Sequence, residues 1–195
     1  MKFTREGLLT AILVVAALFV GSFIAERIPH PDRVLTEQPF YHGAELGETV
    51  RLRTAEVTVD GVDTAKRVER FGEVSESAGV WLVVDIVWSP IHEPRTLGGS
   101  SVFVRARDGR EFGDTQAVTS TCGPTQPGVP VACQIAIEVD PSALAGAQLL
   151  IPADGFVRAS DDVAVVDLGI DEARAGGLAA TDAQLKLLDP TAVGR

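Results

Sequence analysis

Lysine is scarce in this chain, and acidic residues outnumber basic ones. Only three of the 195 residues are lysine, and the formal net charge is −10. Nucleic acids are bound mainly through Lys and Arg side chains that neutralise phosphates, so we do not expect the chain to bind nucleic acid. The same acidity disfavours docking of its polar part onto an anionic lipid surface.

The sequence also lacks the motifs of common hydrolases and nucleotide-binding proteins. It has no Gly-x-Ser-x-Gly elbow and no His-Glu-x-x-His pattern, and neither a lysine nor a helix start follows Gly98–Ser101, so this run is not a phosphate loop. The three histidines are His30, His42 and His92. His92, in the proline-bracketed loop 90–95, is a weak candidate for a general base because its motif supplies no nucleophile. We predict no catalytic residue and no cofactor, and the chain is not expected to be an enzyme.

Carboxylates are abundant, but their spacing does not define a metal site. Asp60 and Asp63 are candidate calcium ligands, since calcium takes oxygen donors. Acidic residues are also common in turns, where they accept main-chain hydrogen bonds, and we favour this explanation. Asp85 lies inside an apolar run; we expect it to face outward near a strand end or edge, with a buried ion pair as the alternative. No metal ligand is predicted.

One long run near the N-terminus carries no charge. Gly7–Ala25 comprises nineteen uncharged residues, which as a helix would span about 28 Å, close to the hydrocarbon thickness of a bilayer. Lys2 and Arg5 precede it, so the positive-inside rule places residues 1–6 in the cytoplasm and the later chain outside. A cleaved secretory signal is the alternative, but the run is long for one and Phe23 spoils its cleavage motif. We expect an uncleaved single-pass anchor at 7–25.

The rest of the chain divides into three parts. Residues 26–45 contain three prolines and no hydrophobic period, which indicates an extended stalk. Residues 46–168 carry strand and turn signals throughout. Residues 169–195 are rich in Ala, Gly and Asp, and a weak capping box at Thr181 leaves a short helix or disorder as the two alternatives.

The pattern within 46–168 predicts an all-β domain. Val80–Trp88 is expected to be a central strand buried on both faces, and Val131–Val139 alternates as a half-buried strand does. Asp108-Gly109 predicts a type I′ hairpin turn. The run 50–59 alternates with a phase slip near Arg53–Thr54, as in a bulged strand. Further short strands are expected at 147–151 and 163–168. About seven strands favour a β-sandwich.

The two cysteines are close in sequence. Cys122 and Cys133 enclose a loop with three prolines and two glycines. Outside the cytoplasm such a pair is expected to form a disulfide, which would stabilise the fold by roughly 2–3 kcal/mol. A redox-active pair usually has Cys-x-x-Cys spacing at a helix start, and zinc would need further Cys or His ligands. Neither pattern is present.

These strands and turns resemble those of a widespread bacterial family of immunoglobulin-like (telokin-like) exported domains of unknown function, an architecture shared by actinobacterial small secreted immunogenic proteins. The residues that carry the resemblance are Gly47-Glu48-Thr49-Val50, Trp81–Val87, Asp108–Phe112, Pro127-Gly128, and Val139–Pro141 leading to Leu149–Ile151. The chain departs from the family pattern at Ser89, where Asn is usual, and in its cysteine loop. The resemblance implies an immunoglobulin-like sandwich behind an N-terminal anchor and carries over no catalytic residue.

Together these features predict a membrane-anchored extracytoplasmic binding module with a protein partner at or outside the membrane. One version is an accessory subunit of a membrane complex such as a transporter, because small residues such as Gly7, Ala11 and Gly21 allow close helix packing. The alternatives are a free-standing surface or structural antigen-like protein and a metal-dependent envelope hydrolase.

Overall fold

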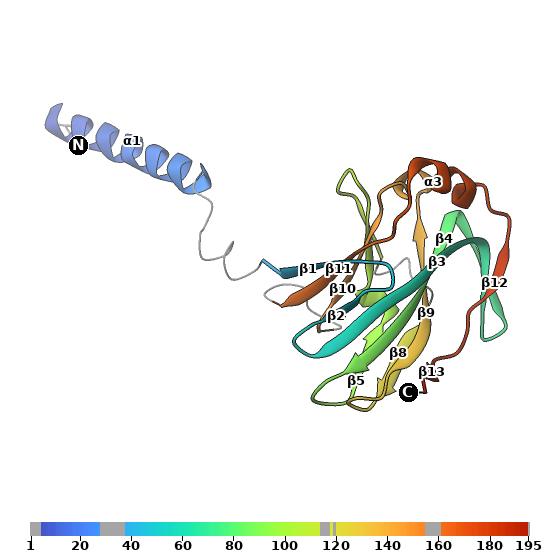
Figure 1. The fold of residues 1–195 in the computed structure, drawn as a ribbon. Helices are drawn as coiled ribbons and strands as arrows, with labels where there is room; N and C mark the ends of the chain where they lie inside the picture. Colours follow the sequence, from blue (N-terminus) through green and yellow to red (C-terminus); the bar gives the residue numbers. More distant parts are fainter. Residues whose placement is uncertain (1–4, 28–37, 114–117, 119, 155–160, 195) are drawn as a thin grey trace. The chain divides into compact units, whose positions relative to one another are not determined.

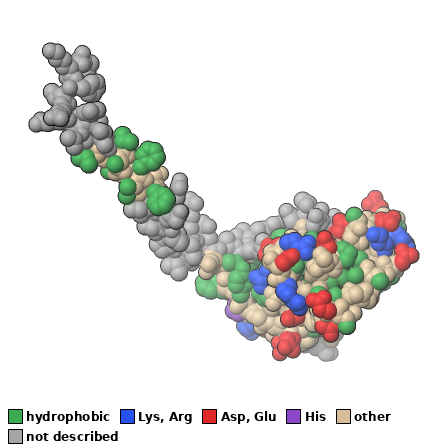
Figure 2. All heavy atoms as spheres, turned by 90° about the horizontal axis from the view of Figure 1, so that it is seen from above, with side chains coloured by type: hydrophobic (Ala, Val, Ile, Leu, Met, Phe, Trp, Pro, Cys, Tyr) green, Lys and Arg blue, Asp and Glu red, His purple; other side chains and the backbone are tan. Residues whose placement is uncertain are grey.

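The computed structural model describes residues 5–27, 38–113, 118, 120–154 and 161–194. They fall into two units, Met1–Gln38 and Pro39–Arg195. In the first unit, helix α1 (Arg5–Arg27) contains the uncharged run, and its described side chains are exposed (Figure 2). Among all the residues described, none of the helices was found to combine the length and apolar character needed to cross a membrane. The predicted transmembrane helix is therefore unconfirmed.

The second unit is a β-sandwich (Figure 1). Sheet A has the strand order β1 (Phe40–Glu45), β11 (Asp162–Asp167), β10 (Gln148–Pro152), β6 (Phe103–Arg105) and β7 (Glu111–Gly113). Sheet B has the order β12 (Gln184–Lys186), β3 (Ala55–Arg70), β4 (Glu73–Pro90), β9 (Val131–Val139) and β13 (Thr191–Ala192), with β2 (Thr49–Arg51) also paired to β3. A separate pair is formed by β5 (Arg95–Gly98) and β8 (Thr121–Thr125). The described residues thus contain thirteen strands rather than about seven.

The main core lies between sheets A and B. Alternate residues of β4 and β9, including Leu82 and Ile135, share one buried cluster with Val104 and Leu149 of sheet A. Each such aliphatic side chain, fully buried, contributes about 1.5–3 kcal/mol of transfer free energy. Strand β4 is central in its sheet, as predicted.

The opposite face of β4 is buried by a different part of the chain. Trp81 and Val83 form a second cluster with Leu187, and Leu185 packs against it. Leu185 and Leu187 belong to residues 181–194, which we call the C-terminal strap. The strap pairs in parallel with β3 through β12 and antiparallel with β9 through β13, so it reaches both edges of sheet B (Figure 1). Burial of both faces explains why the sequence of β4 is apolar at nearly every position.

Two turns differ from their predicted form. At Arg53–Thr54 the chain reverses: Leu52 N donates to Ala55 O at 2.8 Å, and β2 and β3 form a tight hairpin rather than one bulged strand. The phase slip in the sequence is this reversal. The predicted hairpin at Asp108-Gly109 is present between β6 and β7. Only Gly109 of that pair has a positive φ (+88°), and Gly109 N donates to Ala106 O, so the turn is type I followed by glycine rather than type I′.

The sandwich extends past the predicted bounds of 46–168 at both ends. Strand β1 lies in the predicted stalk and pairs in parallel with β11. In the tail, helix α3 (Glu172–Ala179) precedes Thr181 instead of following it. Its N-terminus is capped by the Asp171 side chain, which accepts from Arg174 N at 2.8 Å. Residues after Thr181 form strands because their main chain completes the edges of sheet B.

Candidate functional site

The candidate site is a groove of about 720 Å³ at one end of the sandwich. It lies among the β4–β5 connection, the start of β8 and the end of β10. We call it the end groove, and it is lined by Trp88, Glu93, Pro94, Arg95, Thr96, Gly98, Thr121, Ala153 and Asp154. Its volume is in the range of about 300–1,000 Å³ that is usual for small-molecule sites.

Main-chain hydrogen bonds fix the loop that forms one wall of the groove. Pro90 ends β4, since proline has no N–H to donate to a ladder. Ile91 N then donates to Thr54 O at 2.9 Å, and Gly128 N donates to Pro90 O at 3.0 Å. These bonds hold the chain in place as it passes from β4 to Glu93, so the groove is built on ordered backbone.

The predicted disulfide is present and supports the second wall. Cys122 and Cys133 are bonded, with their Cα atoms 5.4 Å apart. Cys122 lies on β8 opposite Leu97 of β5, and Cys133 lies on β9. The bond therefore joins the β5–β8 pair to sheet B, and it also positions the adjacent groove residue Thr121.

Arg95 sits between two carboxylates in the groove. Its Nη2 is 2.5 Å from Glu93 Oε1, and its Nη1 is 3.7 Å from Asp154 Oδ2. The three side chains carry a formal charge of −1. The Arg95 side chain is 25% exposed, so its guanidinium is partly withdrawn from water, where ion pairs are stronger than at the open surface.

Two N–H groups in the groove walls have no acceptor among the described residues. They are Trp88 Nε1 and Arg95 Nε, and both nitrogens are buried. The other tryptophan does have an acceptor, since Trp81 Nε1 donates to Ser75 O at 3.1 Å. A buried donor without an acceptor costs about 1–3 kcal/mol. Both nitrogens are out of contact with solvent.

A tight ion pair lies near the groove. Arg53 donates to Asp161 twice, at 2.9 Å from Nε and 2.6 Å from Nη2. Hydrogen bonding from Arg53 holds the pKa of Asp161 below its usual range, and the same bond raises the pKa of Arg53. The neighbouring Asp162 accepts from Arg53 N at 2.7 Å and lies 3.2 Å from His42 Nε2. These contacts tie the β2–β3 turn to β11 and so brace this end of the sandwich.

The structure does not gather the other predicted candidates into one place. His92 is exposed and is not among the groove-lining residues, although Glu93 and Arg95 beside it are. His42 lies on β1 rather than in a stalk, and His30 falls outside the described residues. In the part of the chain that the structure describes, no set of three or more His, Cys, Asp or Glu side chains is placed to hold a metal ion.

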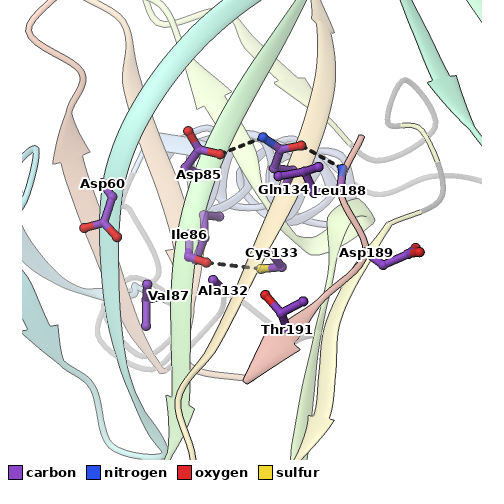
Figure 3. A pocket seen from close by; sticks show the side chains of 10 residues that line it. All are labelled: Asp60, Asp85, Ile86, Val87, Ala132, Cys133, Gln134, Leu188, Asp189 and Thr191. Atoms are coloured by element: carbon purple, nitrogen blue, oxygen red, sulfur yellow. Dashed lines mark hydrogen bonds between the residues drawn. The ribbon is translucent and has the colours of Figure 1, made fainter. Parts of the chain in front are cut away.

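Asp85 belongs to a different, smaller pocket of about 80 Å³ on the outer face of sheet B (Figure 3). It is exposed, as predicted, but it lies on the central strand β4 rather than at an edge. Asp85 Oδ1 accepts from Gln134 Nε2 at 2.8 Å, and Gln134 Oε1 accepts from Leu188 N at 2.8 Å. Figure 3 shows these two bonds in series. Hydrogen bonds at this pocket therefore connect the strap to sheet B.

Comparisons with known proteins identify no family. No protein-family model matches the chain, and no curated protein matches it. Similar solved structures include the secreted protein MPT63 of Mycobacterium tuberculosis, at 15% identity and a TM-score of 0.46, covering 66% of this chain and 98% of that one. The yjhA protein of Bacillus subtilis has 13% identity and a TM-score of 0.43, covering 63% and 99%. An uncharacterised β-sandwich protein of Clostridium difficile has 10% identity and a TM-score of 0.38, and the match covers 68% of this chain and 97% of that one. These likenesses are too weak to transfer a function.

Proposed function

We propose that the chain is a membrane-anchored, extracytoplasmic binding module of the immunoglobulin-like type, whose partner is a protein at or outside the membrane. The observation that supports binding is the end groove, an open site with ordered walls that presents charged side chains of both signs. Arg95 supplies a partly exposed guanidinium group, and Glu93 supplies carboxylate oxygens. A few convergent polar groups in a cleft are what recognition requires.

The anchor is supported by the N-terminal unit taken alone. Large apolar side chains of α1 are exposed at consecutive positions, including Leu18 and Phe19 at 68% and 75%. Consecutive helical residues point in directions about 100° apart, so these side chains surround the helix and do not form one stripe. Such a helix needs apolar surroundings on every side. With Lys2 and Arg5 before the uncharged run, a bilayer with the sandwich outside the cytoplasm satisfies that need.

The proposal is tested by capturing the full-length protein from its native membrane in mild detergent and identifying what comes with it. The groove variant is Arg95→Gln, and the matched control is Arg51→Gln, which removes a surface arginine whose side chain is 70% exposed. We expect a stoichiometric membrane or surface protein to be captured by the wild type and the control and to be lost by the groove variant. If the wild type and both variants captured the partner equally, the groove would not be the binding site. If none of them captured a partner, a free-standing surface protein would be favoured.

A further inference from the structure

We propose that the tip of the β3–β4 hairpin is a second docking surface. It inserts the Phe71 ring into an apolar pocket of a partner protein, and the edge of that pocket carries Lys or Arg side chains. The tip lies at the start of β4, whereas the end groove contains Trp88 near the other end of this strand. The inference therefore goes beyond the proposed groove function and does not depend on it.

Phe71 adopts a backbone conformation that is unfavourable for a bulky side chain. Phe71 and Gly72 form the two-residue turn between β3 and β4 (Figure 1), and their φ angles are +53° and +83°. Positive φ at both central residues is the pattern of a type I′ turn, in which Asn or Asp is usual before Gly. Residues in such strained conformations cluster at functional sites, so the outlier favours a role for Phe71 beyond forming the turn.

The Phe71 ring is held in place without being buried. The residue is 79% exposed, and the guanidinium carbon of Arg70 lies 4.7 Å from the ring centroid, within cation–π distance. Arg70 is itself fixed, because its side chain is 9% exposed and its Nη1 donates to Leu188 O at 2.9 Å. The ring therefore rests on an ordered support, which lowers the entropic cost of binding.

Leu188 extends the apolar surface near the ring. The Arg70 side chain contacts both Phe71 and Leu188, so the two residues lie around one guanidinium group. Leu188 is 64% exposed. Aromatic residues and arginine are enriched at protein interfaces, and an aromatic anchor that fills a partner's pocket is a common source of binding energy. The hairpin tip thus has the composition of an interface centre.

The charge around the tip favours a basic partner. Glu73 is exposed and lies directly across the hairpin from Arg70. Arg70 pairs with Asp189 at 3.8 Å and Lys186 pairs with Glu69 at 3.9 Å, which leaves Glu73 without a basic partner among the described residues. Two basic and three acidic side chains sum to −1, and a partner's Lys or Arg would bring this charge to zero. An anionic lipid surface or a second copy of this acidic chain would be repelled.

Photo-cross-linking from the tip tests the chemistry of the partner. The photoreactive analogue p-benzoylphenylalanine replaces Phe71 in the full-length protein, which is irradiated in its native membrane. The control carries the same analogue in place of Phe40, a 63% exposed residue on β1. We expect the analogue at position 71 to link to a protein segment that contains apolar residues next to Lys or Arg. The analogue at position 40 should not reach that segment.

Two substitutions separate docking from folding, with the analogue now placed at position 188. Phe71→Asn creates the Asn-Gly pair that a type I′ turn prefers, so the urea midpoint of unfolding should stay the same or rise. The same variant should lower the cross-link yield at least about tenfold, as loss of an interface hot spot does. Glu73→Gln should lower the yield up to about fivefold. The control Glu56→Gln, at the start of β3, should leave the yield unchanged.

Three kinds of result would overturn the inference. Links from position 71 only to lipid, or only to a second copy of the chain, would contradict the proposed partner. The absence of any link, or links to one segment from both position 71 and position 40, would contradict a specific docking surface. A lower urea midpoint for Phe71→Asn would show that the ring serves the fold. None of these results involves Arg95, so the groove function is tested separately.

Discussion

Leu188 and Gln134 are joined by a hydrogen bond of 2.8 Å, from the main-chain N–H of Leu188 to the side-chain oxygen of Gln134. The bond links the C-terminal strap to β9 at a point between its two edge ladders. Arg70 adds a second tie on β3, since its Nη1 donates to Leu188 O at 2.9 Å. Leu188 is thus bonded through both its N–H and its C=O, which fixes the middle of the strap over sheet B.

Replacing Gln134 should loosen the strap. Gln134→Ala removes the bonds to Leu188 N and Asp85 Oδ1, and each such bond contributes about 0.5–1.5 kcal/mol. We expect the free energy of unfolding to fall by about 1–2 kcal/mol, measured by urea titration with tryptophan fluorescence. Both tryptophans lie on β4, so the signal reports on the sandwich alone. The control is Gln126→Ala, an exposed position. An equal loss in the control would mean that the Gln134 side chain does not secure the strap.

The strands that can be predicted from the sequence are those with a local hydrophobic pattern. The prediction of β9 at Val131–Val139 and of β4 as the central strand is confirmed, because their buried residues alternate or run continuously. β12 and β13 have three and two residues, and most of their side chains are exposed. Such strands form because sheet B offers two open edges. For β12, that edge belongs to β3, more than a hundred positions away, so it leaves no periodicity in the tail.

Removing the strap should cause self-association. A chain ending at Ala180 loses β12, β13 and Leu187, which opens both edges of sheet B and uncovers Trp81 and Val83. Unpaired edges and exposed apolar surface are templates for pairing between chains. We expect dimers or larger species by light scattering in detergent. A chain ending at Pro190 keeps β12 and Leu187 and should associate less; if both truncations stayed monomeric, the strap would have no shielding role.

The disulfide should stabilise the sandwich measurably. For a loop of this length, the Cys122→Ala, Cys133→Ala double variant should lose roughly 2–3 kcal/mol of unfolding free energy. Adding a reductant during urea titration should lower the stability of the wild type by a similar amount. The reductant should not change the double variant, which serves as the control. Labelling of either cysteine by a thiol reagent in the native, unreduced protein would contradict this bond.

The end groove could not be predicted from the sequence, because its residues come from distant parts of the chain. The sequence predicts Trp88 as a core residue of the central strand, and it is one. Arg95 closes a proline-bracketed loop in which His92 is the more conspicuous candidate. What makes these residues a site is their meeting with Asp154, which lies after β10 and more than fifty positions along the chain. The one local signal for this site in the sequence is the pair of opposite charges, Glu93 and Arg95, in the loop that follows β4.

The proposed anchor predicts where the protein is found after cell lysis. Placing a charge at the helix centre, as in Phe19→Arg, costs about 2.5–3.5 kcal/mol of insertion free energy on translocon scales. We expect this variant to shift toward the fraction released by alkaline carbonate, while the wild type stays with the membranes. Val74→Arg, at an exposed position on β4, is the control and should behave as the wild type does. A wild-type protein recovered mainly in soluble, shortened form would instead indicate a cleaved signal.

Acid should weaken the fold partly through Asp161. Its pKa is lower in the folded protein than in the unfolded chain, chiefly because Arg53 donates to it. A depressed folded pKa means that the pair's contribution is complete above the unfolded value of about 3.9 and is lost as pH falls from there through the folded value. Asp161→Asn should therefore cost about 1 kcal/mol at neutral pH and show a shallower loss of stability below about pH 4. Asp189→Asn, with a side chain that is 79% exposed, is the control, and urea titrations between neutral pH and pH 3 make the comparison. Parallel stability curves for the wild type and Asp161→Asn would mean that the Arg53 pair persists through protonation and does not drive the acid response.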